Sequence, residues 1–97
     1  MIMAWGTPVE IEKRNRIFLC IAAYGYEYAA VSLVSDEAFD AAARAINPQM
    51  ETGNPVMDKF FKEEFSPSTG MWIRKHPDIH GIANRFNQLM KAVGENT

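Results

Sequence analysis

Helix-initiation signals recur along this chain, and they constrain its fold more than any other feature. Thr7 can act as an N-cap that accepts a hydrogen bond, and Pro8 suits the first helical position. Glu10 then completes a capping box with Thr7. The other predicted starts are Ser35 followed by the acidic pair Asp36 and Glu37, Asn54 before Pro55, and Pro77.

Four helices are predicted from these starts. The first two, joined by a short turn, are expected to form an antiparallel helical hairpin over about residues 8–46. Two further helices are predicted over about 55–65 and 77–93, and the apolar residues of the last one follow the helical period closely. No run alternates as a strand does, and 97 residues make one domain. The predicted fold is therefore an all-α, four-helix domain that spans residues 1–97.

The first helix is predicted to reach about Ala30 and to bury one apolar stripe. Gly25 interrupts this helix, which is tolerated where another backbone or a ligand comes close. The single cysteine, Cys20, is expected to behave as a small buried hydrophobe. The predicted stripe consists of Ile11, Phe18, Ile21, Ala22 and Tyr28.

Charge and hydropathy exclude several classes of protein. The net charge is −2 and the ten lysines and arginines are scattered, so no nucleic-acid partner is expected. The apolar run 17–24 is far shorter than the roughly 20 residues that cross a bilayer, so no membrane association is expected. Charged residues interrupt the chain before this run, which does not fit a signal peptide. We therefore expect a cytoplasmic protein.

Aromatic rings and carboxylates gather where the first two predicted helices meet. Asp36, Phe39 and Asp40 are spaced i, i+3 and i+4, so they share one helical face. Tyr26 lies on the preceding helix, between two other tyrosines. Rings from two sides can stack on a flat heterocycle while a carboxylate accepts from its amide or ribose hydroxyl. The alternative is that the tyrosines pack in a helix seam, Asp36 stabilises a first turn and Asp40 is a solvated charge.

The spacing Tyr26-x9-Asp36-x-x-Phe39-Asp40 resembles the N-terminal helical subdomain of NAD-dependent bacterial DNA ligases. The match runs without gaps over residues 24–40. In that family a Tyr-His pair is followed at this spacing by Asp-x-x-Tyr-Asp, and the subdomain binds the nicotinamide mononucleotide (NMN) half of NAD. The resemblance implies NMN or NAD as ligand, with Tyr26 and Phe39 flanking the nicotinamide and Asp36 and Asp40 making its polar contacts.

The chain departs from the ligase pattern in ways that bear on activity. Glu27 stands where the family has His, and a carboxylate there would repel the nucleotide phosphate. Phe39 keeps the stacking face of the family's tyrosine and lacks its hydroxyl. No Lys-x-Asp-Gly adenylation motif is present. The resemblance therefore implies a non-catalytic, ligase-related module, and we expect this chain not to be an enzyme.

A second resemblance favours a different function. Residues 69–77, Thr-Gly-Met-Trp-Ile-Arg-Lys-His-Pro, look like part of small stand-alone phage and prophage proteins related to ligases. The alternative hypothesis is thus an accessory protein that binds a host or phage protein, with Trp72 and Met71 as the expected contacts. Trp72 could instead plug the helical core. A third hypothesis is a subunit that lends its site to a separate catalytic chain.

Two histidines have the spacing of metal ligands. His76 and His80 are four residues apart, as two ligands on one helix would be. Pro77 begins the predicted helix after His76, and no cysteine or third histidine joins the pair. We expect no metal site.

Overall fold

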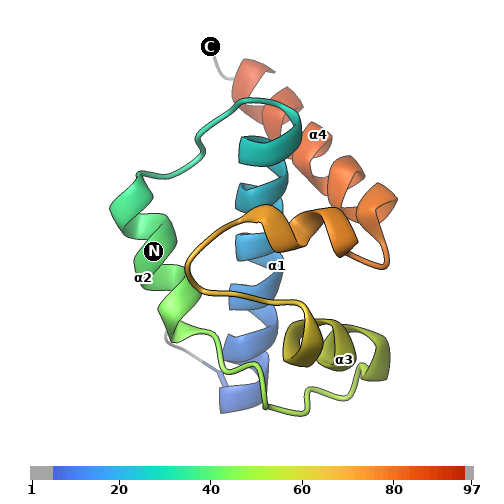
Figure 1. Cartoon of the computed structure of the whole chain (residues 1–97). Coiled ribbons are helices and arrows are strands. Elements are labelled where there is room, and N and C mark those ends of the chain that lie inside the picture. Colours follow the sequence, from blue (N-terminus) through green and yellow to red (C-terminus); the bar gives the residue numbers. More distant parts are fainter. Residues whose placement is uncertain (1–5, 96–97) are drawn as a thin grey trace.

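The computed structural model describes residues 6–95, and the side chains of residues 6–92. This part of the chain contains four α-helices and one short 3-10 helix, η1, and no strand. The predicted all-α fold class is therefore confirmed. The elements are α1 (Pro8–Tyr28), α2 (Asp36–Ala45), α3 (Pro55–Glu63), η1 (Met71–Lys75) and α4 (Ile79–Glu95) (Figure 1).

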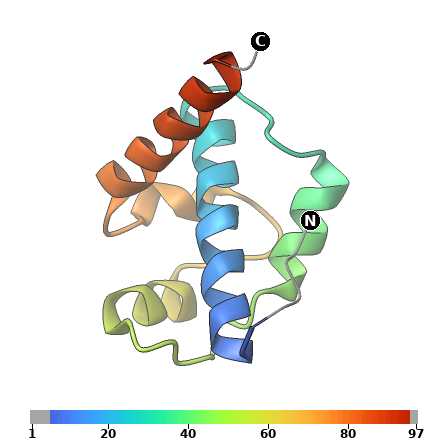
Figure 2. The same ribbon diagram turned by 180° about the vertical axis from the view of Figure 1, so that it is seen from behind.

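Helix α1 is the centre of the fold. It spans 21 residues and packs against α2, η1 and α4. The view from behind shows α2 and α4 on opposite sides of α1 (Figure 2). The connection 29–35 leads from α1 to α2, and the antiparallel geometry of the hairpin over residues 8–46 stays a prediction.

Helix caps form at three of the predicted positions. The Thr7 hydroxyl accepts from the Glu10 backbone N–H at 3.2 Å, and Glu10 Oε1 accepts from the Thr7 N–H at 3.0 Å. This reciprocal pair is the predicted capping box. Ser35 Oγ accepts from the Ala38 N–H at 3.1 Å, and Asn54 caps α3 in the same way.

The start of the last helix differs from the prediction. Helix α4 begins at Ile79 rather than Pro77. Asp78 supplies the cap, because its Oδ1 accepts from the Gly81 N–H at 3.1 Å. Pro77 therefore lies in the turn before the helix, where its fixed φ and missing N–H cost nothing.

An aromatic cluster closes the core between α3 and η1. The Trp72 ring centroid lies 6.0, 5.7 and 5.1 Å from those of Phe60, Phe61 and Phe65. Trp72 is 4% exposed, and its Nε1 donates to the Thr69 carbonyl at 2.7 Å. Trp72 is thus a core plug. The prediction that it contacts a partner protein is wrong, because its own chain covers the indole.

The buried face of α1 is not the predicted stripe. Tyr28 is exposed, and Ile11, Phe18 and Ile21 are only partly buried. Apolar character was a poor guide because polar residues occupy the buried face in the first half of the helix. The buried residues of α1 are Glu12, Asn15, Arg16, Leu19, Cys20, Ala22, Ala23 and Gly25.

Gly25 makes room for α4 beside α1. A Cβ at this position would lie 2.8 Å from Cε1 of Phe86 and 3.2 Å from the carbonyl oxygen of Val31. The Gly25 carbonyl accepts from the backbone N–H groups of Ala29 and Val31, at 3.1 and 2.9 Å. The prediction that another group approaches Gly25 closely is confirmed.

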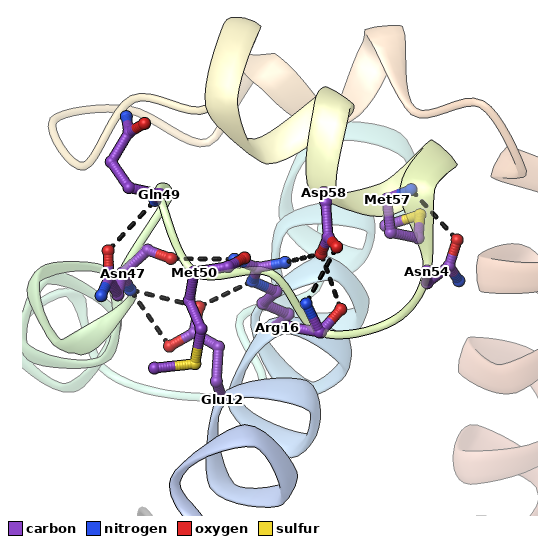
Figure 3. A network of polar contacts seen from close by, with 9 residues as sticks. Glu12, Arg16, Asn47, Gln49, Met50, Asn54, Met57 and Asp58 are labelled. Atoms are coloured by element: carbon purple, nitrogen blue, oxygen red, sulfur yellow. Dashed lines mark hydrogen bonds and ion pairs between the residues drawn. The ribbon is translucent and has the colours of Figure 1, made fainter.

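A buried arginine joins three segments of the chain (Figure 3). Arg16 is 3% exposed; its Nε donates to Glu12 Oε2 at 2.6 Å and its Nη1 to Asp58 Oδ1 at 2.8 Å. Its Nη2 donates to the backbone carbonyls of Asn47 and Met50, at 2.8 and 3.1 Å. Arg16 therefore ties α1 to α3 and to the connection between α2 and α3.

The two carboxylates of this network have further partners. Both Glu12 oxygens accept from the Asn47 N–H at 3.1 Å. Asp58 accepts from the Thr52 hydroxyl at 2.6 Å and from the Thr52 N–H at 2.9 Å. Burial acts to raise the pKa of Asp58, but the hydrogen bonds from Thr52 and Arg16 outweigh it and hold this pKa below its usual value.

Candidate functional site

The four residues predicted to bind a ligand line a single cleft. It has a volume of about 280 Å³ and lies between the C-terminal part of α1, the start of α2 and the segment that precedes η1. We call it the acidic cleft. The predicted residues in its lining are Tyr26, Asp36, Phe39 and Asp40.

Local structure explains how these side chains come together. Ser35 caps α2, which places Asp36 in its first turn and Phe39 and Asp40 one turn later, on the same side of the helix. Gly70 lines the cleft beside them, and a Cβ there would lie 3.5 Å from Cζ of Phe39. The segment before η1 therefore packs beside the Phe39 ring at a distance that would leave room for a Cβ.

The two predicted aromatic walls stay separate from each other. Tyr26 is 60% exposed and Phe39 is partly buried, and neither stacks on the other. Tyr24 and Tyr28, in contrast, stack on each other with ring centroids 4.9 Å apart, and neither lines the cleft. For these two tyrosines the packing interpretation is confirmed.

The lining of the acidic cleft carries negative charge. Asp36 and Asp40 are exposed carboxylates, and no lysine, arginine or histidine joins them in the lining. The polar groups that complete it are the hydroxyls of Ser32, Ser68 and Thr69. The charge of such a cleft favours a cationic ligand over a neutral one and repels an anionic one.

Glu27 lies outside the acidic cleft. One of its carboxylate oxygens is 3.2 Å from Nε of Arg74, which belongs to η1. The Arg74 guanidinium also lies over the Tyr28 ring, 5.3 Å from its centroid. The predicted repulsion between Glu27 and a bound phosphate is therefore weakened by an ion pair that the sequence did not reveal.

The two histidines with metal-ligand spacing lie in different environments. His76 is buried and His80 is exposed. Among the side chains of residues 6–92, no three His, Cys, Asp or Glu groups come together in a way that could hold a metal ion. Cys20 is buried as predicted, and burial raises the pKa of its thiol to about 12.

Comparisons with known proteins add no relative. No protein-family model, curated protein or solved structure matches this chain. The resemblance to the ligase subdomain therefore stays a hypothesis that rests on residues 24–40. Within residues 6–95, no helix has the length and apolarity needed to cross a membrane.

Proposed function

We propose that this chain is a non-catalytic, ligase-related binding module whose acidic cleft takes the nicotinamide ring of NMN or NAD. One observation carries the proposal. Tyr26, Asp36, Phe39 and Asp40 are the four residues that the ligase resemblance implies for the ligand, and all four line the same cleft.

The chemistry of the lining suits a nicotinamide ring. The oxidised ring is flat and cationic, so it gains from stacking on Tyr26 and Phe39 and from cation–π attraction. The carboxylates of Asp36 and Asp40 add Coulomb attraction and can accept hydrogen bonds from the carboxamide and the ribose hydroxyls.

The size and charge of the cleft predict an order of affinity among three nicotinamide compounds. A volume of about 280 Å³ lies near the lower end of the roughly 300–1,000 Å³ typical of small-molecule sites. A nicotinamide riboside fits this scale better than a dinucleotide, and its net positive charge suits two carboxylates. The phosphate of NMN opposes the charge of its ring, so the expected order of affinity is nicotinamide riboside, then NMN, then NAD.

Titration of these three compounds, followed by backbone amide shifts in NMR spectra, tests the proposal. We expect saturable shifts around residues 22–40 and 68–70, in the order of affinity given above. Tyr26→Ala should weaken nicotinamide riboside binding about tenfold, because a stacking face is lost. Asp36→Asn should weaken it about threefold, as expected for one partly exposed charge.

Tyr28→Ala is the matched control for Tyr26→Ala. Tyr28 is also an exposed tyrosine of α1, but it lies outside the lining of the cleft. Equal losses for the two variants, or no saturation at millimolar concentrations of all three ligands, would contradict the proposal.

A protein–protein role is the second candidate, and one observation favours it. Met71 is 61% exposed at the start of η1, although Trp72 beside it is buried. Methionine is enriched at protein contacts, so a host or phage protein that binds here should lose affinity on Met71→Glu. This candidate becomes the better account if the nicotinamide titrations are flat.

A further inference from the structure

A second cleft, lined by none of the residues of the acidic cleft, lies between α1 and the N-terminal ends of α3 and α4. Its volume is about 450 Å³, larger than that of the acidic cleft. Much of its wall is apolar, contributed by Ile17, Cys20, Val56, Met57 and Ile82. We call it the basic cleft, because Lys13 and Arg85 also line it.

His76 lines the basic cleft, and its ring carries a buried donor without an acceptor. Only 7% of His76 is exposed, and its Nδ1 accepts from the Asp78 backbone N–H at 2.9 Å. The lone pair on Nδ1 is thus in use, so the proton of the neutral ring resides on Nε2. Nε2 is buried and has no hydrogen-bond partner among the residues that the structure describes. A buried N–H of this kind carries a desolvation penalty that a bound acceptor would remove.

The neutral state of His76 follows from its surroundings. Burial lowers the pKa of His76 below its usual value, against the opposing charge of Asp78. The Asp78 carboxylate is engaged in capping α4 through the Gly81 N–H. The ring packs edge-on against Phe60, with centroids 5.0 Å apart, which fixes its orientation.

The charges around the basic cleft leave two cations available to a ligand. Lys13 and Arg85 are exposed, and neither makes an ion pair or a hydrogen bond with the residues that the structure describes. Arg16 and Asp78 also line the cleft. Glu12 and Asp58 already pair with Arg16, and the Asp78 carboxylate accepts from the Gly81 N–H. The positive charge of Arg85 acts on the buried Cys20 thiol, because it lowers the pKa that burial raises.

We infer that the basic cleft binds a small carboxylate with an apolar body. The apolar body contacts the wall formed by Ile17, Met57 and Ile82, and a carboxylate oxygen accepts from Nε2 of His76. Lys13 and Arg85 complement the negative charge at the mouth. An apolar wall of this extent with a single buried donor suits a carboxylate better than a phosphate, which requires several donors.

Two carboxylates serve as probes, and they separate the aromatic from the aliphatic form of this ligand class. We propose NMR titrations with 2-naphthoate and with octanoate, and with 2-naphthalenemethanol as the neutral analogue. Binding of either acid should shift amides of α1, α3 and the 76–82 segment, and should move the Nε2–H signal of His76. The neutral alcohol should bind about tenfold more weakly, because a charged acceptor makes the stronger hydrogen bond.

Variants separate the roles of charge and hydrogen bond. Arg85→Gln should weaken binding of the acids about threefold, as expected for one exposed charge. Lys62→Gln is the matched control, because Lys62 is an exposed cation outside the basic cleft, and it should leave affinity unchanged. His76→Phe keeps a ring in place and should weaken binding about tenfold through the lost donor.

Three outcomes overturn the inference. No saturation with either acid at millimolar concentration would mean a cleft that holds water only. Equal affinity for the acid and the alcohol would mean an apolar groove without charge recognition. A His76 ring protonated on Nδ1 rather than Nε2, read from its nitrogen shifts, would remove the donor. None of these outcomes touches the acidic cleft, so the nicotinamide proposal is tested separately.

Discussion

The two halves of α1 bury different kinds of residue against the rest of the fold. The N-terminal half buries Glu12 and Arg16, which hold the chain together through charge and hydrogen bonds. The C-terminal half buries Ala22, Ala23 and Gly25, whose small size lets neighbouring segments come close. The periodicity of apolar residues predicts the small-residue face better than the polar face, because it assigns a charged residue such as Arg16 to the surface.

The polar half of α1 makes hydrogen bonds to the backbone of the connection between α2 and α3. The connection 46–54 has no regular secondary structure, yet its backbone groups need hydrogen-bond partners. Arg16 supplies donors to the carbonyls of Asn47 and Met50, and Glu12 accepts from the Asn47 N–H. The side chains of Arg16 and Glu12 therefore make the hydrogen bonds to this backbone that regular secondary structure would otherwise make.

Removal of the arginine should have the largest effect on stability. Arg16→Ala leaves Glu12 and Asp58 without their cation, and we expect a loss of about 3–5 kcal/mol in the free energy of unfolding. For a domain of this size that loss approaches the whole stability, so thermal unfolding followed by circular dichroism is the appropriate measurement.

Two further variants sharpen this prediction. Arg44→Ala removes an exposed cation of α2 and should change the free energy of unfolding by less than about 0.5 kcal/mol. Arg16→Lys keeps the charge but loses the multiple donors, so its loss should lie between the other two. A loss below about 1 kcal/mol for Arg16→Ala would contradict the structural role of the network.

The small-residue half should respond to a single methyl group. Gly25→Ala gains up to about 1 kcal/mol of helix propensity, but its Cβ would meet the Phe86 ring at 2.8 Å. Because overpacking costs about 1–3 kcal/mol, we expect a net loss of stability, measured by urea unfolding. The same exchange at Gly70 is the control, since its Cβ would meet only ordinary contacts at 3.5 Å or more. A stabilised Gly25→Ala variant would show that α4 can move away.

The polar network should also make the free energy of unfolding depend on pH in the acidic range. The pKa of Asp58 is lowered in the folded state, so its contribution is complete above the unfolded pKa of about 3.9 and is lost as the pH falls further. The free energy of unfolding should therefore decline as the pH falls below about 4, by a fraction of the Arg16 effect. Asp58→Asn should flatten this decline, and an unchanged slope would assign the acid sensitivity to other carboxylates.

Local signals made the helix starts predictable. Thr7, Ser35 and Asn54 cap their helices because the bond partner of each cap lies three residues away, a distance that the sequence displays. The residues of the acidic cleft were also predicted from spacing, because Asp36, Phe39 and Asp40 lie on one helical turn. The contribution of Gly70 to this cleft comes from a distant segment and left no local signal.

Long-range partners explain what the sequence concealed. Glu12 and Arg16 show the i, i+4 spacing of a helical ion pair, but nothing local indicates that Asp58 would join them and bury the group. His76 likewise gives no sign of burial, because Phe60, its ring neighbour, lies on another helix. Trp72 was assigned both to a surface and to the core, and only the packing of three phenylalanines decides between them.

The short helix η1 acts as a partition between the two clefts. Gly70 at one end belongs to the acidic cleft, and His76 at the other belongs to the basic cleft. Trp72 anchors η1 in the core through its packing against Phe60, Phe61 and Phe65. If both proposals hold, a cation in the acidic cleft and an anion in the basic cleft can be bound at the same time, because the two clefts share no lining residue.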